Sequence, residues 1–78
     1  MIEKIRVLKY LTDELISSLA INANRKVVKD QEDEANKGKE WKDRKYTYLN
    51  MPKVSKAKLK RLRLSINEML LELEKTEL

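Results

Sequence analysis

Apolar residues in the first third of the chain follow the spacing of an α-helix. They recur at intervals of three, four and seven residues, which places them on one helical face. The main positions of this face are Ile5, Leu8, Leu15, Leu19 and Ala23. A second set, which widens the face to roughly half of the cylinder, is Ile2, Leu11, Ile16, Ala20 and Val27. The pattern predicts a first helix over residues 2–28.

The polar run after this helix does not stop it at once. Residues 29–37 contain no glycine or proline and are mostly good helix formers. Asp33 and Lys37 stand four residues apart in the order that favours a helical ion pair. The helix can therefore extend to residue 37, with Gly38 as a left-handed stop.

A second helix is indicated by start signals and a regular apolar stripe. Pro52 cannot continue a helix from upstream, and Ser55 is a favoured N-cap residue. Apolar residues then alternate spacings of three and four, as in the a and d positions of a heptad. These residues are Leu59, Leu62, Ile66, Met69 and Leu73. They predict a helix over residues 56–75.

The connector, residues 38–54, has no clear periodicity. Residues 40–45 are compatible with a short helix, whereas residues 46–49 favour extended backbone. We expect a short helix or an irregular segment there. The predicted fold is all-α: one domain, residues 1–78, built as an antiparallel helical hairpin.

The second helix has more apolar surface than a hairpin can bury. Opposite the stripe described above, a further set recurs every seven residues: Ala57, Leu64, Leu71 and Leu78. We predict that this set is a partner interface and that the hairpin assembles into a helical-bundle oligomer, a homodimer in the simplest case. The alternative is that the connector folds back and covers it with its own apolar residues, which are Trp41, Tyr48, Leu49 and Met51.

Composition narrows the chemistry. A chain of 78 residues supports only a marginal core, and it has no cysteine for disulfides. Histidine is absent too, so the usual zinc ligands and acid–base catalysts are missing. The acidic run Asp30, Glu32, Asp33 and Glu34 does not match a calcium loop. We therefore expect no enzyme activity, no cofactor, no metal and no small-molecule substrate.

The apolar runs are too short for a membrane helix. None approaches the ~20 residues of a span. The N-terminal residues carry an acid and lack the continuous apolar stretch of a signal peptide. The expected location is the cytoplasm, with no membrane partner.

Charge is concentrated in the middle of the chain. Residues 37–63 hold eleven basic and two acidic residues, although the net charge of the whole chain is only +5. Basic side chains with interleaved rings are typical of single-strand nucleic-acid binding. The candidate phosphate or acidic-partner contacts are Lys53, Lys56, Lys58, Lys60, Arg61 and Arg63. The candidate stacking residues are Trp41, Tyr46 and Tyr48.

Two functions follow from these features. The first is a small non-enzymatic helical interaction protein that binds a larger protein and regulates or inhibits it. Such a chain would suit a phage or a mobile element. The second is a small basic nucleic-acid-binding protein that uses residues 37–63. The basic residues can also be a solvated surface that answers the neighbouring acidic blocks.

Overall fold

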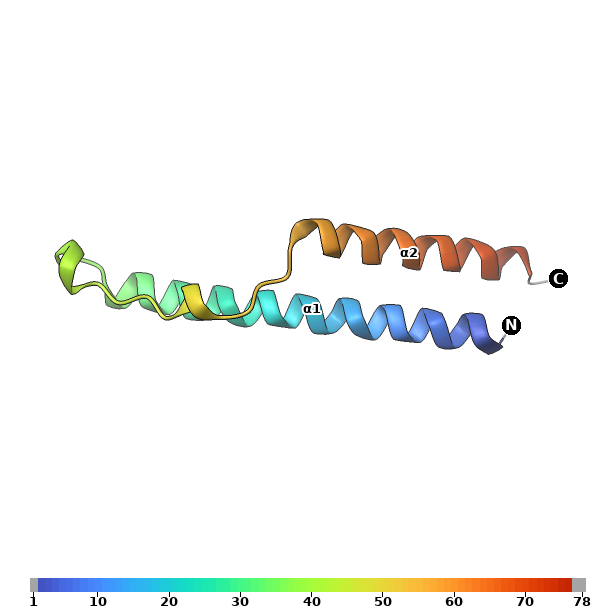
Figure 1. The fold of residues 1–78 in the computed structure, drawn as a ribbon, viewed down its shortest axis with the longest axis horizontal. Helices are drawn as coiled ribbons and strands as arrows, with labels where there is room; N and C mark the ends of the chain where they lie inside the picture. Colours follow the sequence, from blue (N-terminus) through green and yellow to red (C-terminus); the bar gives the residue numbers. More distant parts are fainter. Residues whose placement is uncertain (1, 77–78) are drawn as a thin grey trace. The chain divides into compact units, whose positions relative to one another are not determined.

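A computed structural model of the chain describes residues 2–76, and it confirms the all-α architecture. Two long helices, α1 (Ile2–Ala35) and α2 (Lys56–Lys75), are joined by a connector with two short 3-10 turns (Figure 1). These turns are η1 (Trp41–Asp43) and η2 (Tyr48–Asn50). No strand occurs between residues 2 and 76.

Helix α1 takes the longer of its two predicted lengths. It continues through the polar run to Ala35, and Gly38 follows in the left-handed region with φ +82°. Asp33 forms an ion pair with a lysine one helical turn away, as expected. The partner is Lys29, at 3.0 Å, and not Lys37. Similar pairs join Lys9 to Asp13 and Lys26 to Asp30, so side-chain pairing supports the exposed surface of the helix.

Helix α2 begins and ends where the sequence predicts. The Ser55 side chain accepts a hydrogen bond from the backbone N–H of Lys58 at 3.2 Å, which confirms Ser55 as the N-cap. This bond satisfies one of the amide groups that the first helical turn leaves without a partner.

The chain forms two compact units. Among the described residues, the first unit comprises residues 2–19 and 54–76, and the second comprises residues 20–53. Helix α1 supplies residues to both units.

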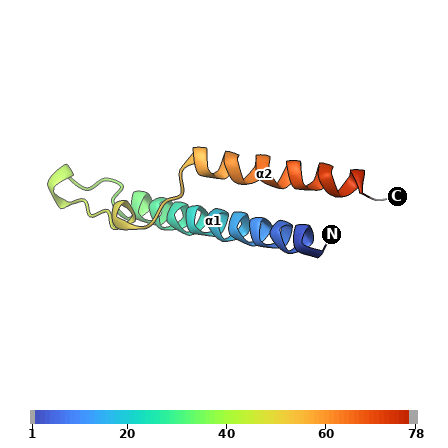
Figure 2. The same cartoon turned by 45° about the vertical axis from the view of Figure 1, so that its right-hand side comes forward.

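In the first unit, α2 lies antiparallel beside the N-terminal part of α1 (Figures 1 and 2). Two exposed ion pairs fix this direction, because Lys4 meets Glu72 at 3.7 Å and Glu14 meets Lys58 at 3.3 Å. The predicted stripe of α2 is the side that becomes half-buried, and its residues are Leu59, Leu62, Ile66, Met69 and Leu73. The stripe therefore faces α1, as a heptad seam requires.

The face that α1 uses differs from the predicted one. The residues covered in the first unit are Leu8, Leu11 and Leu15, which are half-buried, and Ser18, which is buried. These four positions are spaced three, four and three residues apart. Ile5 and Leu19 were expected in the same face but are exposed. Helix α2 offers one stripe and covers only a narrow part of the apolar face of α1. The rest of that face stays exposed to solvent.

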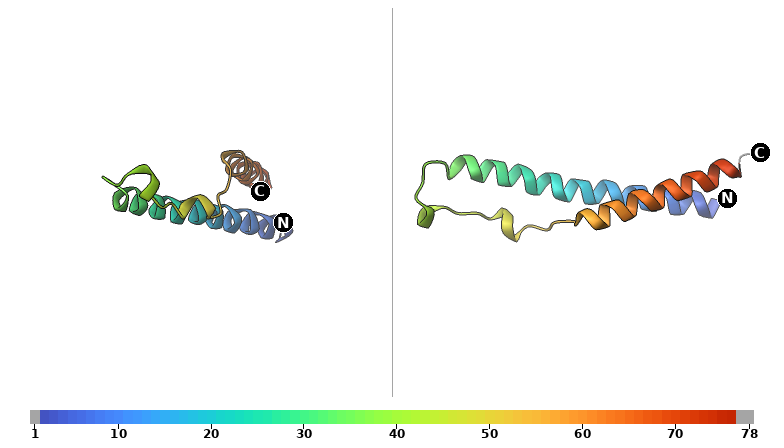
Figure 3. Two further views of the ribbon diagram at one scale, coloured as in Figure 1. Left: turned by 60° about the vertical axis from the view of Figure 1, so that its left-hand side comes forward. Right: turned by 90° about the horizontal axis from the view of Figure 1, so that it is seen from above.

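In the second unit, residues 36–53 run back alongside residues 20–35 of α1 (Figure 3). Two side chains of the helix end hold this connector. Glu32 accepts hydrogen bonds from the backbone N–H groups of Thr47 at 2.6 Å and Tyr48 at 2.8 Å. The side chain of Asn36 donates to the carbonyl of Lys45 at 2.7 Å and accepts from its N–H at 3.2 Å. The connector is thus irregular but anchored.

The backbone of the connector agrees with the sequence prediction in part. The helical tendency of residues 40–45 is reduced to the single turn η1. The expected extended segment 46–49 does not form, because Thr47 already has right-handed helical dihedrals (φ −86°, ψ −22°) and Tyr48 begins η2.

Candidate protein-binding surfaces

The described residues contain no buried hydrophobic side chain. The two residues classed as buried are polar: Ser18 is 2% exposed and Asn36 is 5% exposed. The leucine stripes between α1 and α2 are only half-buried. Much of the apolar surface that drives folding therefore remains in contact with water, where it is available for association.

The outer stripe of α2 consists of Ala57, Leu64 and Leu71 in the described residues. It lies on the side of α2 away from the half-buried stripe, and Leu64 and Leu71 are 51% and 56% exposed. Leu78, the fourth predicted member, lies outside the residues that the structure describes. The described members are thus accessible, as a partner interface would need.

The connector residues proposed as an alternative cover belong to the second unit. Trp41 is 83% exposed and Leu49 is also exposed. Tyr48 is held within the second unit, against α1. Leu64 and Leu71 of the outer stripe are each about half exposed, and a cover supplied by the connector stays a prediction.

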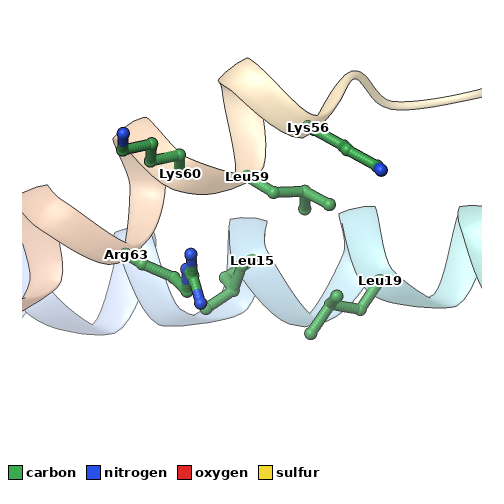
Figure 4. Close-up of a pocket in the computed structure, with 6 residues that line it drawn as sticks. All are labelled: Leu15, Leu19, Lys56, Leu59, Lys60 and Arg63. Atoms are coloured by element: carbon green, nitrogen blue, oxygen red, sulfur yellow. The ribbon is translucent and has the colours of Figure 1, made fainter.

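A second apolar surface lies on one side of the first unit. We call it the α1–α2 groove, a hollow of about 320 Å³. It is lined by Leu15, Leu19, Lys56, Leu59, Lys60 and Arg63. Leu59 reaches from α2 towards Leu15 and Leu19 of α1, which together form an apolar floor (Figure 4). The volume is at the lower end of the range for ligand pockets, and it suits one or two side chains of a partner.

The rim of the groove is positively charged. Lys56, Lys60 and Arg63 all come from the first two turns of α2, and the ammonium of Lys60 points away from α1 (Figure 4). No acidic residue lines the groove. An occupant with carboxylates around an apolar strip would match both the floor and the rim.

The structure divides the predicted basic cluster. Lys56, Lys60 and Arg63 line the groove, but Lys58 pairs with Glu14 of α1. Lys53 belongs to the other compact unit. Because the residues of α2 surround the helix instead of sharing one face, they do not form a single track for a phosphate backbone.

The predicted stacking residues are divided in the same way. Trp41 is exposed, whereas Tyr46 and Tyr48 are half-buried and pack edge to face with ring centroids 5.9 Å apart. The guanidinium of Arg25 lies 5.0 Å from the centre of the Tyr48 ring. This cation–π contact occupies the ring, so Tyr48 serves the second unit itself.

Electrostatics in the second unit centres on the same contacts. The hydrogen bond from the Thr47 N–H lowers the pKa of Glu32, and the Tyr48 N–H and the Thr47 hydroxyl act in the same direction against partial burial. The hydrogen bond to Asp33 raises the pKa of Lys29. In both cases the hydrogen bonds favour the charged form of the side chain. Charged Glu32 holds the connector, and charged Lys29 pairs with Asp33 within α1.

The acidic run of α1 is engaged in separate contacts. Asp30 pairs with Lys26, Asp33 pairs with Lys29 and Glu32 binds the connector backbone. Among residues 2–76, no three acidic side chains converge as a metal site would require. In the described residues, Asp30, Glu32 and Asp33 are thus engaged in contacts within α1 or with the connector.

The groove was not foreseen from the sequence, although its signal was present. The apolar sector of α1 spans roughly half of the cylinder, and α2 offers one stripe to cover it. The sequence pattern places the partner interface on α2 and predicts both Leu15 and Leu19 in the contact between the helices. Comparing the widths of the two apolar sectors would have indicated a groove beside the seam.

Comparisons with protein-family models, with curated proteins and with solved structures found no match for this chain. Within residues 2–76, neither helix combines the length and the apolar character needed to cross a membrane.

Proposed function

We propose that this chain is a small helical interaction protein that binds a larger protein through the α1–α2 groove. The partner would contribute an amphipathic helix with acidic flanks. The observation that carries this proposal is the groove itself, in which an apolar floor lies beside three cationic side chains. By occupying a helix that the partner uses elsewhere, the chain would regulate or inhibit that partner.

The apolar floor would supply most of the affinity. Leu19 is 50% exposed and Leu15 and Leu59 are half-buried, so each still has surface to lose. Burying a large aliphatic side chain fully is worth about 1.5–3 kcal/mol relative to exposure. The rim charges would add selectivity and a faster association rate.

Synthetic peptides test the chemistry of the partner. Two helical peptides would share one leucine stripe, with glutamates on the flanks of the first and lysines on the flanks of the second. We expect calorimetric titration to detect binding of the glutamate peptide and not of the lysine peptide. Equal affinity for both peptides, or binding of neither, would contradict the proposal.

A groove variant tests the location. Leu19→Lys places a charge on the floor. It should lower the affinity for the glutamate peptide by at least about tenfold, the equivalent of ~1.4 kcal/mol. Tyr10→Lys changes an exposed α1 residue outside the groove and is the matched control. Circular dichroism of both variants should show unchanged helicity. Equal binding by Leu19→Lys would move the site elsewhere.

The natural partner can be found by capture from the native host followed by mass spectrometry. Wild-type protein, Leu19→Lys and Tyr10→Lys would be compared after nuclease treatment. The proposal expects a protein retained by wild type and Tyr10→Lys and lost with Leu19→Lys. Retention that depends on intact nucleic acid would support the second candidate instead.

That second candidate is single-strand nucleic-acid binding, and the accessible Trp41 ring favours it. As the chain has one tryptophan, stacking on a base would quench its fluorescence directly. Six phosphate contacts would lose a factor on the order of 10³ between 50 and 200 mM salt. Retention unchanged by replacing Lys58, Lys60, Arg61 and Arg63 with Gln would remove this candidate.

A further inference from the structure

The outer stripe runs along α2, and the sign of the charge on this helix reverses near its middle. From Lys56 to Arg63 the helix carries five basic residues and no acid. Beyond Leu64 its acids are Glu68, Glu72 and Glu74, with Lys75 as the one base. Leu64 stands at the change of sign and is half exposed.

Such a helix is complementary to an antiparallel copy of itself. Two parallel copies would set basic half against basic half, whereas two antiparallel copies set each basic half against an acidic half. A two-fold axis generates this arrangement, since each copy then presents the same patch to the other. The charge pattern therefore identifies both the partner and its direction.

We propose that two copies of this chain associate through the outer stripes of their α2 helices, antiparallel about a two-fold axis at Leu64. The Leu64 side chains of the two copies meet on the axis. Ala57 and Leu71, seven residues to either side, then face each other across the interface. This surface is distinct from the α1–α2 groove and does not depend on it.

The same register aligns charges on the flanks of the stripe. Arg61 lies three residues before Leu64 and Glu68 four residues after it, about 4.5 Å and 6 Å along the axis. The two-fold therefore brings Arg61 level with Glu68 of the other copy, on the same flank. Neither side chain forms an ion pair within the described part of the chain, unlike Lys58 and Glu72. Both are available for the pairing.

The need for such a contact comes from the lack of a buried apolar residue among residues 2–76. Chains of this size commonly complete a marginal core by oligomerisation when they have no disulfide. The outer stripe offers one apolar position in each heptad, and the charges beside it set the direction of the partner helix.

Cysteine cross-linking tests the axis, and the natural chain supplies a clean background because it has no cysteine. We expect Leu64→Cys to form a covalent dimer under mild oxidation, since a disulfide needs Cα atoms within about 7 Å. Ser65→Cys, one residue further and off the stripe, is the matched control and should stay monomeric on a denaturing gel. Equal cross-linking of the two would overturn the proposed axis.

A mixture of two variants tests the direction. Ala57→Cys and Leu71→Cys should cross-link to each other and only weakly to themselves. Preferential self-linking of each variant would show parallel helices and overturn the antiparallel arrangement.

Charge reversal tests the register. Arg61→Glu should weaken the dimer by about tenfold or more in sedimentation, because both copies lose a pair and gain a repulsion. Adding Glu68→Arg should restore it, as each pair is re-formed with exchanged signs. Arg63→Glu makes the same charge change on the groove side and should have little effect. Absence of rescue, or a wild-type monomer near 9 kDa at high micromolar concentration, would refute the proposal.

The two proposals fail separately. Leu64→Lys with Leu71→Lys should abolish the dimer and leave titration of the glutamate peptide unchanged. Leu19→Lys should weaken binding of the glutamate peptide and leave the dimer measured by sedimentation unchanged.

Discussion

At the scale of single residues, polar side chains do much of the organising in the second unit. Glu32 accepts three hydrogen bonds from Thr47 and Tyr48, and Asn36 makes two with Lys45. The sequence shows an acidic run at residues 30–34 but does not show which carboxylate meets the connector. That depends on the phase of α1 relative to a loop whose path has no periodic signal.

The Glu32 contacts make the connector sensitive to acid. The pKa of Glu32 is lowered in the folded chain, so its contribution is complete above the ordinary glutamate pKa and is lost as the pH falls through the lowered value. We expect the amide signals of Thr47 and Tyr48 to shift towards disordered values in that range.

The variant Glu32→Gln should remove this pH dependence, and Glu34→Gln, an exposed neighbour, should preserve it. Nuclear magnetic resonance titration of the three proteins measures the difference. Identical titration of Thr47 in wild type and Glu32→Gln would show that another group controls the connector.

At the scale of elements, the helices were largely predictable and their contact faces were not equally so. The start of α2 at Lys56 follows from Ser55, and its half-buried stripe follows from the regular spacing of three and four. In α1, ten apolar positions of similar character are available, and the packing of α2 selects among them. The a/d stripe of α2 packs on Leu8, Leu11 and Leu15 and leaves Ile5 and Leu19 exposed.

The cap of α2 has a measurable share in stability. Ser55→Ala removes the acceptor for the Lys58 N–H and should lower the free energy of unfolding by about 0.5–2 kcal/mol. Ser65→Ala, in the middle of the same helix, should be neutral or slightly stabilising because alanine has the higher helix propensity. Urea unfolding followed by circular dichroism compares them. An equal loss of unfolding free energy in both variants would show that the Ser55 cap does not contribute to stability.

At the scale of the whole molecule, the main property is the large apolar surface left in water. The sequence predicted excess apolar surface on α2, and the structure adds the groove beside it. What sequence could not provide is the course of the connector, because side-chain hydrogen bonds to Lys45, Thr47 and Tyr48, and not an apolar pattern, hold it against α1.

Association through that surface should make stability depend on concentration. A dimer binds only folded chains to one another, so the midpoint of thermal unfolding should rise with protein concentration. Circular dichroism melts between about 5 and 500 µM would measure the rise. In Leu64→Lys with Leu71→Lys the midpoint should stay constant. A constant midpoint in the wild type would argue for a chain that is stable alone.

The separation of contacts along the sequence also sets an order of folding. The hydrogen bonds of Asn36 and Glu32 to the connector join residues nine to sixteen positions apart, whereas Lys58 reaches Glu14 across forty-four. Closing the longer loop costs more chain entropy and must wait until α2 has left the ribosome. The connector can therefore dock on α1 during synthesis, while the leucines of α1 remain unpaired until the last helix arrives.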